Sequence, residues 1–496
     1  MSDAVIRSRR AFLLETAIIG LVAAGFPRPL AAQLARRGAV GAPVRVRGRV
    51  SSNGRGLARV AVSDGATVVT TGADGRYELL TAADRRHVSL SIPSGYHLPL
   101  QPNGTVRHFA AIAPGAGGEQ RIDFALEPLS GSDDSHAFVL CADPQVQNAY
   151  EMARLHAETV PDLAATRQAF GDVPIFGIGD GDLMFDDLSL YPEYERGLRA
   201  TGIPFFSVVG NHDLDQNAGI DEGSTSTFER HFGPAWYSFN RGRAHYVVLD
   251  DVFWHGDGYL GYLSATQLEW LRQDLALIEP GSPVIVLLHI PAASTRPART
   301  GERQQRTGEM VTNRAALYQL LEPFDAHLLS GHTHENEHIF SDGVHEHVNG
   351  TVCGAWWSGA ICWDGTPNGY TVYEVRGEEV RWRYKATGQP DAHQLRVYGW
   401  KSDPHAPDDI VANVWNWDPQ WTVTWYEGAD RRGLMSRRRG FDPQAVAEQL
   451  GADKPSRRTW VEPVLNDHMF YAPAGTGAIR VEVVDRAGRT YSAALS

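Results

Sequence analysis

Five short segments in the middle of the chain contain the side chains that could do chemistry. These segments are Ala142-Asp143-Pro144-Gln145, Gly181-Asp182, Gly210-Asn211-His212-Asp213, Leu288-His289-Ile290 and Gly331-His332-Thr333-His334. They supply carboxylates, an amide and several imidazoles but no thiolate, a set that suits metal ions of intermediate hardness such as manganese, iron or zinc. Two such ions ~3.5–4 Å apart can clamp a phosphoryl group and activate a water molecule. The residue types therefore indicate a metal site suited to phosphoryl chemistry.

Each of these segments lies at or just after a predicted strand. Sheet proteins with helical connections tend to place ligand and catalytic groups at such strand ends. Mostly apolar runs, typical of strands buried on both faces, recur at 137–142, 173–178, 203–209, 244–249, 284–288 and 326–329. Helical stretches lie between several of them, for example Glu151–Phe170 and Ser264–Leu277. Residues 135–375 are therefore predicted to form an α/β or α+β body in which helices cover the sheets.

The flanking regions have a different pattern. A chain of 496 residues exceeds the ~250–300 residues that one hydrophobic core usually serves, so more than one domain is expected. Residues 43–128 contain short alternating strands separated by Asp-Gly turns, which predicts a small β-sandwich used as a spacer or docking module. Residues 377–496 return to alternation, for example at Arg381–Lys385, with one helical segment at Asp442–Leu450. We expect a second β-rich domain there.

The net charge and the cysteines exclude some classes of protein. A net charge of −13 argues against a nucleic-acid-binding face, which would be basic, and indicates a solvated acidic surface. Three cysteines are too few for a disulfide scaffold. Cys141 is expected to stay free in a buried strand. Cys353 and Cys362 could pair if the protein is exported.

The first 32 residues are typical of an export signal. Arg9-Arg10 precedes a moderately apolar run from Leu14 to Phe26, and small residues follow it. This pattern resembles a twin-arginine signal and predicts a periplasmic or secreted protein. The alternative is an amphipathic or membrane-anchoring helix. The run is shorter than the ~20 apolar residues of a transmembrane span, so no transmembrane anchor is expected after processing.

The order of the motifs between Asp143 and His334 resembles that of the calcineurin-like metallophosphoesterases. Gly-Asn-His-Asp and Gly-His-Thr-His are its specific parts, whereas a lone Gly-Asp carries little information. Residues 356–359, 366–370, 413–417 and 467–470 resemble a bacterial subgroup with β-sandwich domains on both sides of the core. The resemblance implies an αββα two-sheet sandwich core flanked by two β-sandwich-like domains.

The resemblance also implies a role for each residue. His212 would face the substrate and stabilise or protonate the leaving oxygen, Asp213 would orient His212, and a metal-bridging hydroxide would attack phosphorus in line. The implied metal ligands are Asp143 and His334 for the first ion, Asn211, His289 and His332 for the second, and Asp182 for both.

Two positions depart from the pattern of the family. The first motif usually ends in histidine, but Gln145 stands there and could bind the first ion weakly, bind it through water, or leave the position open. Gly179-Asp180-Gly181-Asp182 also offers two bridging candidates. Asp182 is preferred because Asp186 then completes the Gly-Asp-x-x-x-Asp spacing.

Polar residues after the final motif could be mistaken for further ligands. Glu335, Glu337 and His338 are predicted to form a solvated loop. His345 and His347 alternate on a strand-like run. Surface positions are expected for them, although His347 could line the site.

The predicted function is hydrolysis of phosphate esters, with monoesters favoured. The alternative is a phosphodiesterase that acts on a lipid headgroup, a nucleotide or a glycan-linked phosphate. Trp356, Trp357 and Trp363 would suit such a bulky substrate if they form a wall of the cleft, but they could equally pack against the C-terminal domain. A second alternative is a non-catalytic binding module. Gln145 is the feature that favours it, and His212 argues against it.

Overall fold

The computed structural model describes residues 43–113, 118–302, 306–452 and 454–495. The chain divides into two compact units. Among the described residues, the first contains residues 43–91, 109–127 and 265–274, and the second contains the remainder. The predicted export signal, residues 1–32, lies outside the described residues. Within the described ranges, no helix has the length and apolar character needed to cross a membrane.

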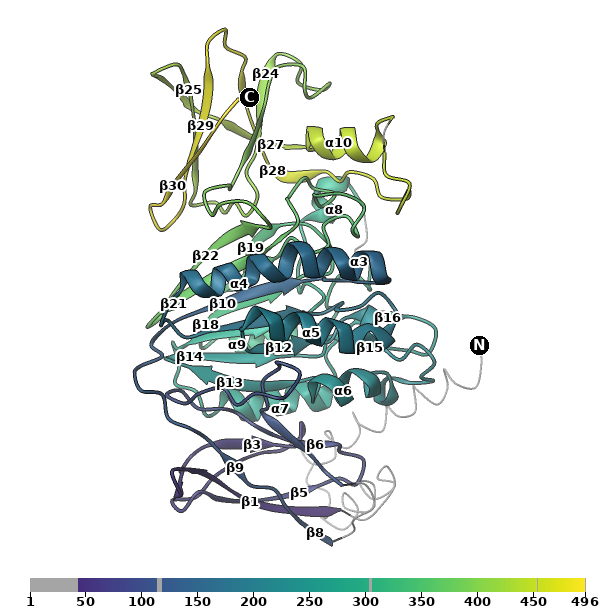
Figure 1. The fold of residues 1–496 in the computed structure, drawn as a ribbon, viewed down its shortest axis with the longest axis vertical. Helices are drawn as coiled ribbons and strands as arrows, with labels where there is room; N and C mark the ends of the chain where they lie inside the picture. Colours follow the sequence, from purple (N-terminus) through teal and green to yellow (C-terminus); the bar gives the residue numbers. More distant parts are fainter. Residues whose placement is uncertain (1–42, 114–117, 303–305, 453, 496) are drawn as a thin grey trace. The chain divides into compact units, whose positions relative to one another are not determined.

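The first unit is built from two small sheets (Figure 1). Buried and exposed residues alternate at the start of β1, as expected for a strand with one face in a core. One sheet has the order β2-β1-β5, with β8 and β9 also paired to β1, and the other has the order β4-β3-β6-β7. The strands are β1 (Val44–Ser52), β2 (Arg55–Gly56), β3 (Ala61–Ser63), β4 (Val68–Thr70), β5 (Arg76–Thr81), β6 (His87–Leu90), β7 (Phe109–Ala111), β8 (Gly118–Arg121) and β9 (Phe124–Ala125).

The second unit contains two larger sheets and the predicted metal-binding segments. The order in the first of these is β12-β11-β10-β21-β22, and β10, β11 and β12 are parallel. Its strands are β10 (Ser135–Ala142), β11 (Ile175–Asp180), β12 (Phe205–Val208), β21 (Gly369–Arg376) and β22 (Glu379–Ala386). Arg381–Lys385, expected in the C-terminal domain, lies instead in β22 of this sheet. The two-residue turn at Gly377 and Glu378 places β22 antiparallel to β21.

The second large sheet has the order β13-β14-β17-β18-β20-β19. The four strands from β14 to β20 are parallel, and the two edge strands are antiparallel to their neighbours. A separate hairpin precedes β17 in the chain. The bounds are β13 (Tyr237–Arg241), β14 (Ala244–Val248), β15 (Val252–Trp254), β16 (Tyr259–Gly261), β17 (Pro283–Leu287), β18 (Asp325–Ser330), β19 (Glu337–Ser341) and β20 (Val344–Val348).

Aromatic rings fill the space between the two large sheets. Phe176 of the first sheet lies 5.4 Å from Phe239 and 5.3 Å from Tyr246 of the second, both edge to face. On the outer face of the first sheet, Leu163 and Tyr194 of the covering helices join strand residues in one core. The expected αββα layering is confirmed. The helices of at least five residues are α3 (Ala149–Arg154), η1 (Leu155–Thr159), α4 (Val160–Ala169), α5 (Tyr191–Thr201), α6 (Ser226–Phe232), α7 (Ala265–Leu275), α8 (Arg296–Thr300), α9 (Arg314–Leu321) and α10 (Pro443–Leu450).

The predicted helix Glu151–Phe170 forms as a continuous run of α3, η1 and α4, and η1 is a π-helical turn. Pro161 stands at the start of α4. Because proline has no N–H and its ring crowds the preceding turn, the wider π turn allows the helix to continue through it.

The C-terminal domain contains two four-stranded antiparallel sheets with the orders β23-β24-β28-β27 and β26-β25-β29-β30. Trp425, Phe470 and Val481 lie in the apolar core between them. Asp442 caps α10 by accepting the N–H of Ala445. The strands are β23 (Arg396–Tyr398), β24 (Asp409–Asn413), β25 (Thr422–Glu427), β26 (Asp430–Leu434), β27 (Ser436–Gly440), β28 (Asn466–Pro473), β29 (Ile479–Val484) and β30 (Thr490–Ala494).

All three cysteines are buried with free thiols. Cys141 lies in β10, as predicted. The possible bond between Cys353 and Cys362 is not formed. The Thr351 hydroxyl lies 3.7 Å from the first sulfur and 3.6 Å from the second.

Candidate metal centre

The predicted ligands follow the carboxyl ends of parallel strands in the two large sheets. This topology explains why residues far apart in the sequence meet at one edge of the sandwich. Asp143 directly follows β10, Asp182 follows β11, Asn211 follows β12, His289 follows β17 and His332 follows β18.

Five of the predicted ligands have left-handed backbone conformations. The φ angles are 46° at Asp143, 43° at Gln145, 47° at Asp182, 66° at His332 and 55° at His334. A non-glycine residue in this region costs of order 1–3 kcal/mol and persists where its surroundings hold it. Backbone hydrogen bonds help to hold these residues in the left-handed conformation. For example, the Gln145 N–H donates to the Asp182 carbonyl at 2.8 Å. Strain gathered in this way is typical of a functional site.

Three ligand atoms converge on the Nε2 atom of the His289 imidazole. Its Nε2 lies 3.3 Å from Asp182 Oδ1, 3.2 Å from Asn211 Oδ1 and 3.2 Å from His332 Nδ1. His289, Asp182 and Asn211 are buried. Together with His289 Nε2, these atoms are a carboxylate oxygen, an amide oxygen and two imidazole nitrogens. At these separations they form a set that a single metal ion can bind.

The other predicted ligands form a second group. Asp143 Oδ1 and His334 Nε2 lie 3.5 Å apart and are buried, and neither atom has a hydrogen-bond partner among the described residues. A shared metal ion would satisfy both atoms, since ligands bonded at about 2.0–2.2 Å can lie this far apart. The amide nitrogen of Gln145 donates to Asp182 Oδ2 at 2.9 Å. The residues present therefore fit a pair of metal ions.

The second ring nitrogen of each histidine in these two groups contacts a backbone carbonyl. Such contacts fix the tautomer and the orientation of a metal-binding imidazole. The pairs are His289 Nδ1 with Asp180 (3.2 Å), His332 Nε2 with Gly308 (2.9 Å) and His334 Nδ1 with Gly354 (2.7 Å).

Asp182 and Asp180 differ in their surroundings. Asp182 accepts the backbone N–H of His212 at 2.8 Å, so it joins the Gly-Asn-His-Asp segment to the group around His289. Burial alone would raise the pKa of Asp182, but His289 and His212 bring it below its ordinary value. In the described part of the chain, neither carboxylate oxygen of Asp180 has a hydrogen-bond partner, and burial raises its pKa well above the ordinary range. Asp182 is thus the carboxylate that faces the other ligands.

His212 has a defined orientation beside the metal-binding groups. Its Nδ1 lies 2.7 Å from Asp186 Oδ1, and its ring stacks on Phe185 at 4.1 Å. Burial alone would lower the pKa of this imidazole, but Asp182 and Asp186 raise it above its ordinary value. The Gly-Asp-x-x-x-Asp spacing was the sequence signal for Asp186. No pattern in the sequence indicated the stacking ring of Phe185.

The expectation that Asp213 orients His212 is not met, because Asp186 is the carboxylate that pairs with the imidazole. Asp213 is fully buried instead. Burial raises its pKa to about 7. Its carboxylate accepts hydrogen bonds from the backbone N–H groups of Leu183 (3.0 Å), Met184 (3.2 Å) and Gly210 (3.0 Å) and from the Tyr191 hydroxyl (2.9 Å). Asp213 therefore connects the two loops that carry Asp182 and Asn211.

Replacing Asp213 with alanine is therefore expected to destabilise the fold by roughly 3 kcal/mol or more, since each buried donor left unpaired costs about 1–3 kcal/mol. Urea unfolding followed by tryptophan fluorescence measures this loss. The matched variant Asp186→Ala, at a more exposed carboxylate, should unfold close to wild type. An Asp213→Ala protein of unchanged stability would contradict the role of Asp213 in connecting the two loops.

Asp251 also supports the site, although nothing in the sequence singled it out. Its carboxylate accepts the backbone N–H groups of His289 at 3.2 Å and Ile290 at 2.9 Å. This contact fixes the backbone that presents the His289 imidazole.

The tryptophans contact both the site and the C-terminal domain. Trp356 stacks on His334 at 4.0 Å and lies 4.6 Å from Trp460. Trp363 Nε1 donates to the carbonyl of Thr333 at 2.9 Å. Trp356 thus contacts a predicted ligand and also packs against the C-terminal domain, whereas a role of these tryptophans in a substrate cleft stays a prediction.

The prediction that Glu335 and Glu337 lie in a solvated loop is wrong. Both carboxylates are buried, and both accept from the guanidinium of Arg299 at 2.5 Å. A charged group is rarely buried without a partner. Here α8, which lies 36 residues earlier in the chain, supplies the partner.

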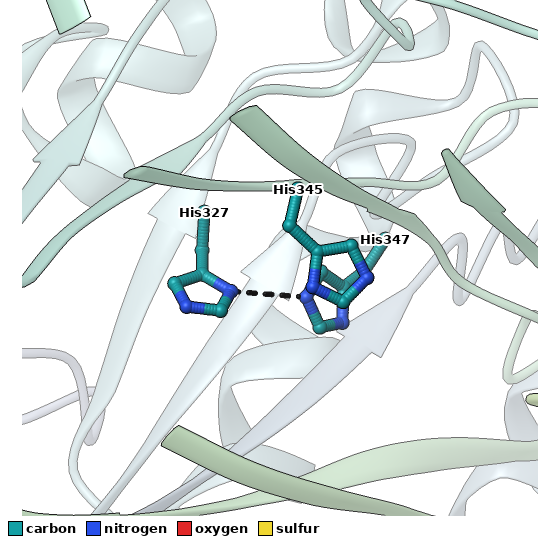
Figure 2. A group of neighbouring side chains, drawn as sticks. All are labelled: His327, His345 and His347. Carbon is teal, nitrogen blue, oxygen red and sulfur yellow. Dashed lines mark hydrogen bonds between the residues drawn. The ribbon is translucent and has the colours of Figure 1, made fainter. Parts of the chain in front are cut away.

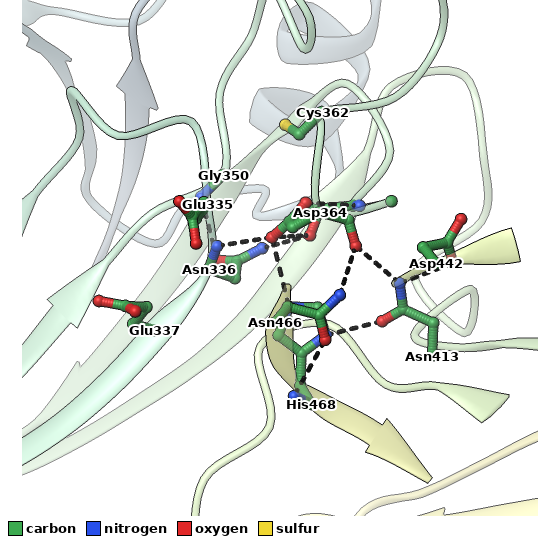
Figure 3. Close-up of polar contacts among 12 residues, drawn as sticks. Glu335, Asn336, Glu337, Gly350, Cys362, Asp364, Asn413, Asp442, Asn466 and His468 are labelled. Atoms are coloured by element: carbon green, nitrogen blue, oxygen red, sulfur yellow. Dashed lines mark hydrogen bonds and ion pairs between the residues drawn. The ribbon is translucent and has the colours of Figure 1, made fainter. Parts of the chain in front are cut away.

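Asp364 connects the last metal-binding loop to the C-terminal domain (Figure 3). Its carboxylate accepts the backbone N–H of Asn336 at 2.9 Å and lies 3.3 Å from His468 Nε2. Its carbonyl accepts from the side chains of Asn413 at 3.0 Å and Asn466 at 3.1 Å. The C-terminal domain thereby supports the segment that follows His334.

Known proteins and solved structures resemble parts of this chain. A 3′,5′-cyclic-nucleotide phosphodiesterase from Nostoc sp. is 30% identical over 121 residues, which cover 24% of this chain and 41% of that relative. The match thus spans less than half of the curated relative. A dimetal phosphatase from Danio rerio has 14% identity and a TM-score of 0.35, covering 51% of this chain and 96% of its own. A purple acid phosphatase from yellow lupin has the same identity and TM-score, covering 66% and 67%.

Family models give the decisive result. The model for the N-terminal part of calcineurin-like phosphoesterases matches residues 44–129, the calcineurin-like phosphoesterase model matches residues 136–336, and the model for the C-terminal part matches residues 346–491. Three models of one family thus match in the expected order, and the chain belongs to the calcineurin-like phosphoesterases, which are metal-dependent phosphoesterases.

Proposed function

We propose that this phosphoesterase hydrolyses phosphomonoesters with two metal ions held by the residues described above. The convergence of Asp182, Asn211 and His332 on the Nε2 atom of His289 carries the proposal. The facing atoms of Asp143 and His334, which have no hydrogen-bond partner in the described part of the chain, give it independent support.

The ligand set divides between two ions, of which manganese, iron and zinc are the candidates. Asp143, His334 and, more weakly, Gln145 would hold the first ion. Asn211, His289 and His332 would hold the second, and Asp182 would bind both. When bound, such ions supply Lewis-acid polarisation of the phosphoryl oxygens and activation of a water molecule.

His212 performs the proton transfer in this proposal. Asp186 and the ring of Phe185 fix the imidazole in one orientation. A protonated imidazole held in this way donates its proton to the leaving oxygen as the ester bond breaks. Phosphate esters of poor leaving groups therefore depend most on this side chain.

A phosphodiesterase is the second candidate. The local similarity to a cyclic-nucleotide phosphodiesterase favours it. The aromatic rings of Trp356 and Trp460 near His334 would also suit the bulky second substituent of a diester.

Metal analysis combined with two model substrates tests the proposal and separates the candidates. Protein purified and loaded with manganese, iron or zinc should hold two ions per chain at this centre and release p-nitrophenol faster from p-nitrophenyl phosphate than from its bis ester. The reverse preference would establish the diesterase. Two bound ions with no turnover of either ester would overturn both and favour a binding module.

Gln145 offers a direct test of the first metal position. Gln145→His should raise the affinity of that position by about 10-fold, because an imidazole is a stronger ligand for these ions than a neutral amide. Competition with a chelating dye measures the affinity, and Gln145→Ala is the matched control. If Gln145→Ala loses one ion completely, the glutamine is a full ligand, and the proposal that it binds the first ion only weakly is wrong.

We further propose that residues 1–32 direct export of the chain to the periplasm or beyond. Paired arginines before an apolar run support this proposal. Replacing Arg9 and Arg10 together with lysine should leave the full chain in the cytoplasm on cell fractionation. Export that continues unchanged would exclude the twin-arginine route.

A further inference from the structure

Four histidines share one face of the second large sheet, away from the predicted metal ligands. His345 and His347 lie two residues apart on β20, so their side chains point to the same face. The parallel register of β18 places His327 beside His345, and the antiparallel register of β19 places His338 beside His347. His327 lies inside β18, five positions before His332, which follows the end of that strand.

The ring nitrogens of three of these histidines face one another (Figure 2). His327 Nδ1 lies 3.1 Å from His347 Nε2. One nitrogen from each of His327, His345 and His347 lies within 4.8 Å of the other two. Two ligands of a tetrahedral zinc ion, each bonded at about 2.0–2.1 Å, lie about 3.3 Å apart. The cluster therefore needs only a small adjustment to surround a cation.

The surroundings keep these imidazoles in the form that binds metals. The exposed fraction is 8% for His327, 7% for His345 and 1% for His347. Burial lowers the pKa of His327 to about 4 and lowers those of the other two below their ordinary value. Neutral imidazole is the species that binds a metal ion. The ring of Trp382, 4.6 Å from that of His347, covers the cluster from the first large sheet.

We propose that His327, His345 and His347 form a separate mononuclear site for a borderline divalent cation, with zinc preferred. Three imidazole nitrogens without a carboxylate or a thiolate suit zinc. Because the cluster is buried between the sheets, the ion would have a structural role. It would tie β18 to β20 at the end of the sandwich where the sheets meet the C-terminal domain.

His338 would support this site from outside. Its Nδ1 lies 3.0 Å from His345 Nε2, and its Nε2 lies 2.8 Å from the side-chain oxygen of Asn416 in the C-terminal domain. Histidines that bind zinc are commonly oriented by such neighbouring polar groups. A bound ion would thus couple the core sheet to the C-terminal domain through Asn416.

Access and charge are compatible with a cation. Phe340, which is 49% exposed, stacks on His345 at 4.0 Å, so displacing one surface side chain opens a path. Arg486 lies near the cluster, with its guanidinium 4.6 Å from the ring of Trp382. Its charge is offset by the buried Asp418, 3.0 Å away.

Zinc binding to the full chain tests the site. The protein is stripped with a chelator, titrated with Zn²⁺ and desalted, and the bound ions are counted by mass spectrometry. The wild type should retain three ions per chain. His327→Gln and His347→Gln should each retain one fewer. His136→Gln replaces another buried histidine between the sheets, one that contacts the Tyr246 hydroxyl, and should retain all three. Equal counts in the wild type and the cluster variants would overturn the proposal.

A second measurement separates this site from the catalytic centre and does not require the cluster variants to fold. In Asp182→Asn the catalytic centre is impaired, so the remaining tightly bound zinc should occupy the histidine cluster. X-ray absorption should then show at least three imidazole nitrogens at about 2.0–2.1 Å. An oxygen-rich environment, or no retained zinc, would overturn the site. A wild-type protein without turnover that still binds this ion at the histidine cluster would contradict the proposed function alone.

Discussion

Replacing Asp182 with asparagine is expected to lower phosphoesterase activity by at least about 10³-fold. The variant should also lose one or both of the metal ions bound at the catalytic centre. The carboxylate contacts His289, Gln145 and the backbone of His212 from the centre of the ligand set. A neutral amide cannot offset the repulsion between two adjacent cations, and a bidentate anion is the group that can hold both. Metal analysis and steady-state kinetics on the same preparation measure the two losses together.

Asp180→Asn is the matched control for this prediction. Asp180 is as deeply buried as Asp182, but its carboxylate makes no hydrogen bond to any other residue that the structure describes. Burial raises the pKa of Asp180 well above the ordinary range, which disfavours its charged form, and asparagine is an uncharged side chain of nearly the same size. This variant should keep its metals and most of its activity. If Asp180→Asn abolishes activity and Asp182→Asn does not, the assignment of the bridging residue is reversed.

The position of the ligands could be predicted because strand ends are visible in the sequence. Apolar runs mark β10, β11, β12, β17 and β18, and each predicted ligand segment follows one of them. Parallel strands in a layered fold bring their carboxyl ends to one edge, so the convergence of the ligands follows from the topology. The left-handed conformations that aim these side chains could not be predicted, because they depend on tertiary contacts such as the hydrogen bond from the His332 N–H to Asp143.

Residues whose environment depends on a distant partner were predicted less well. His345 and His347 alternate as on a half-exposed strand, but β20 lies between β18 and β19, and Trp382 of β22 covers that face. A polar alternation does not reveal which side of a strand is buried. The burial of Glu337 likewise depends on Arg299. The role of Asp213 was mispredicted for the same reason. Only the fold shows that its carboxylate accepts hydrogen bonds from the backbone of a neighbouring loop.

His212→Ala should lower kcat by about 10²–10⁴-fold, the usual contribution of a positioned general acid. The metals should remain bound, because the backbone N–H of residue 212, which donates to Asp182, is unchanged by the substitution. The side chain does not belong to either group of predicted ligands. A loss of turnover with full metal content would therefore separate proton transfer from metal binding.

The leaving group decides whether His212 acts as an acid. p-Nitrophenolate departs readily without a proton, whereas an alkoxide does not, so His212→Ala should impair an alkyl phosphate at least about 10-fold more than p-nitrophenyl phosphate. Asp186→Asn should show the same ordering with smaller losses, because the imidazole stays in place but loses the anion that favours its protonated form. An equal loss on both substrates would mean that His212 stabilises charge on the phosphoryl group, and the leaving oxygen would then take its proton from water.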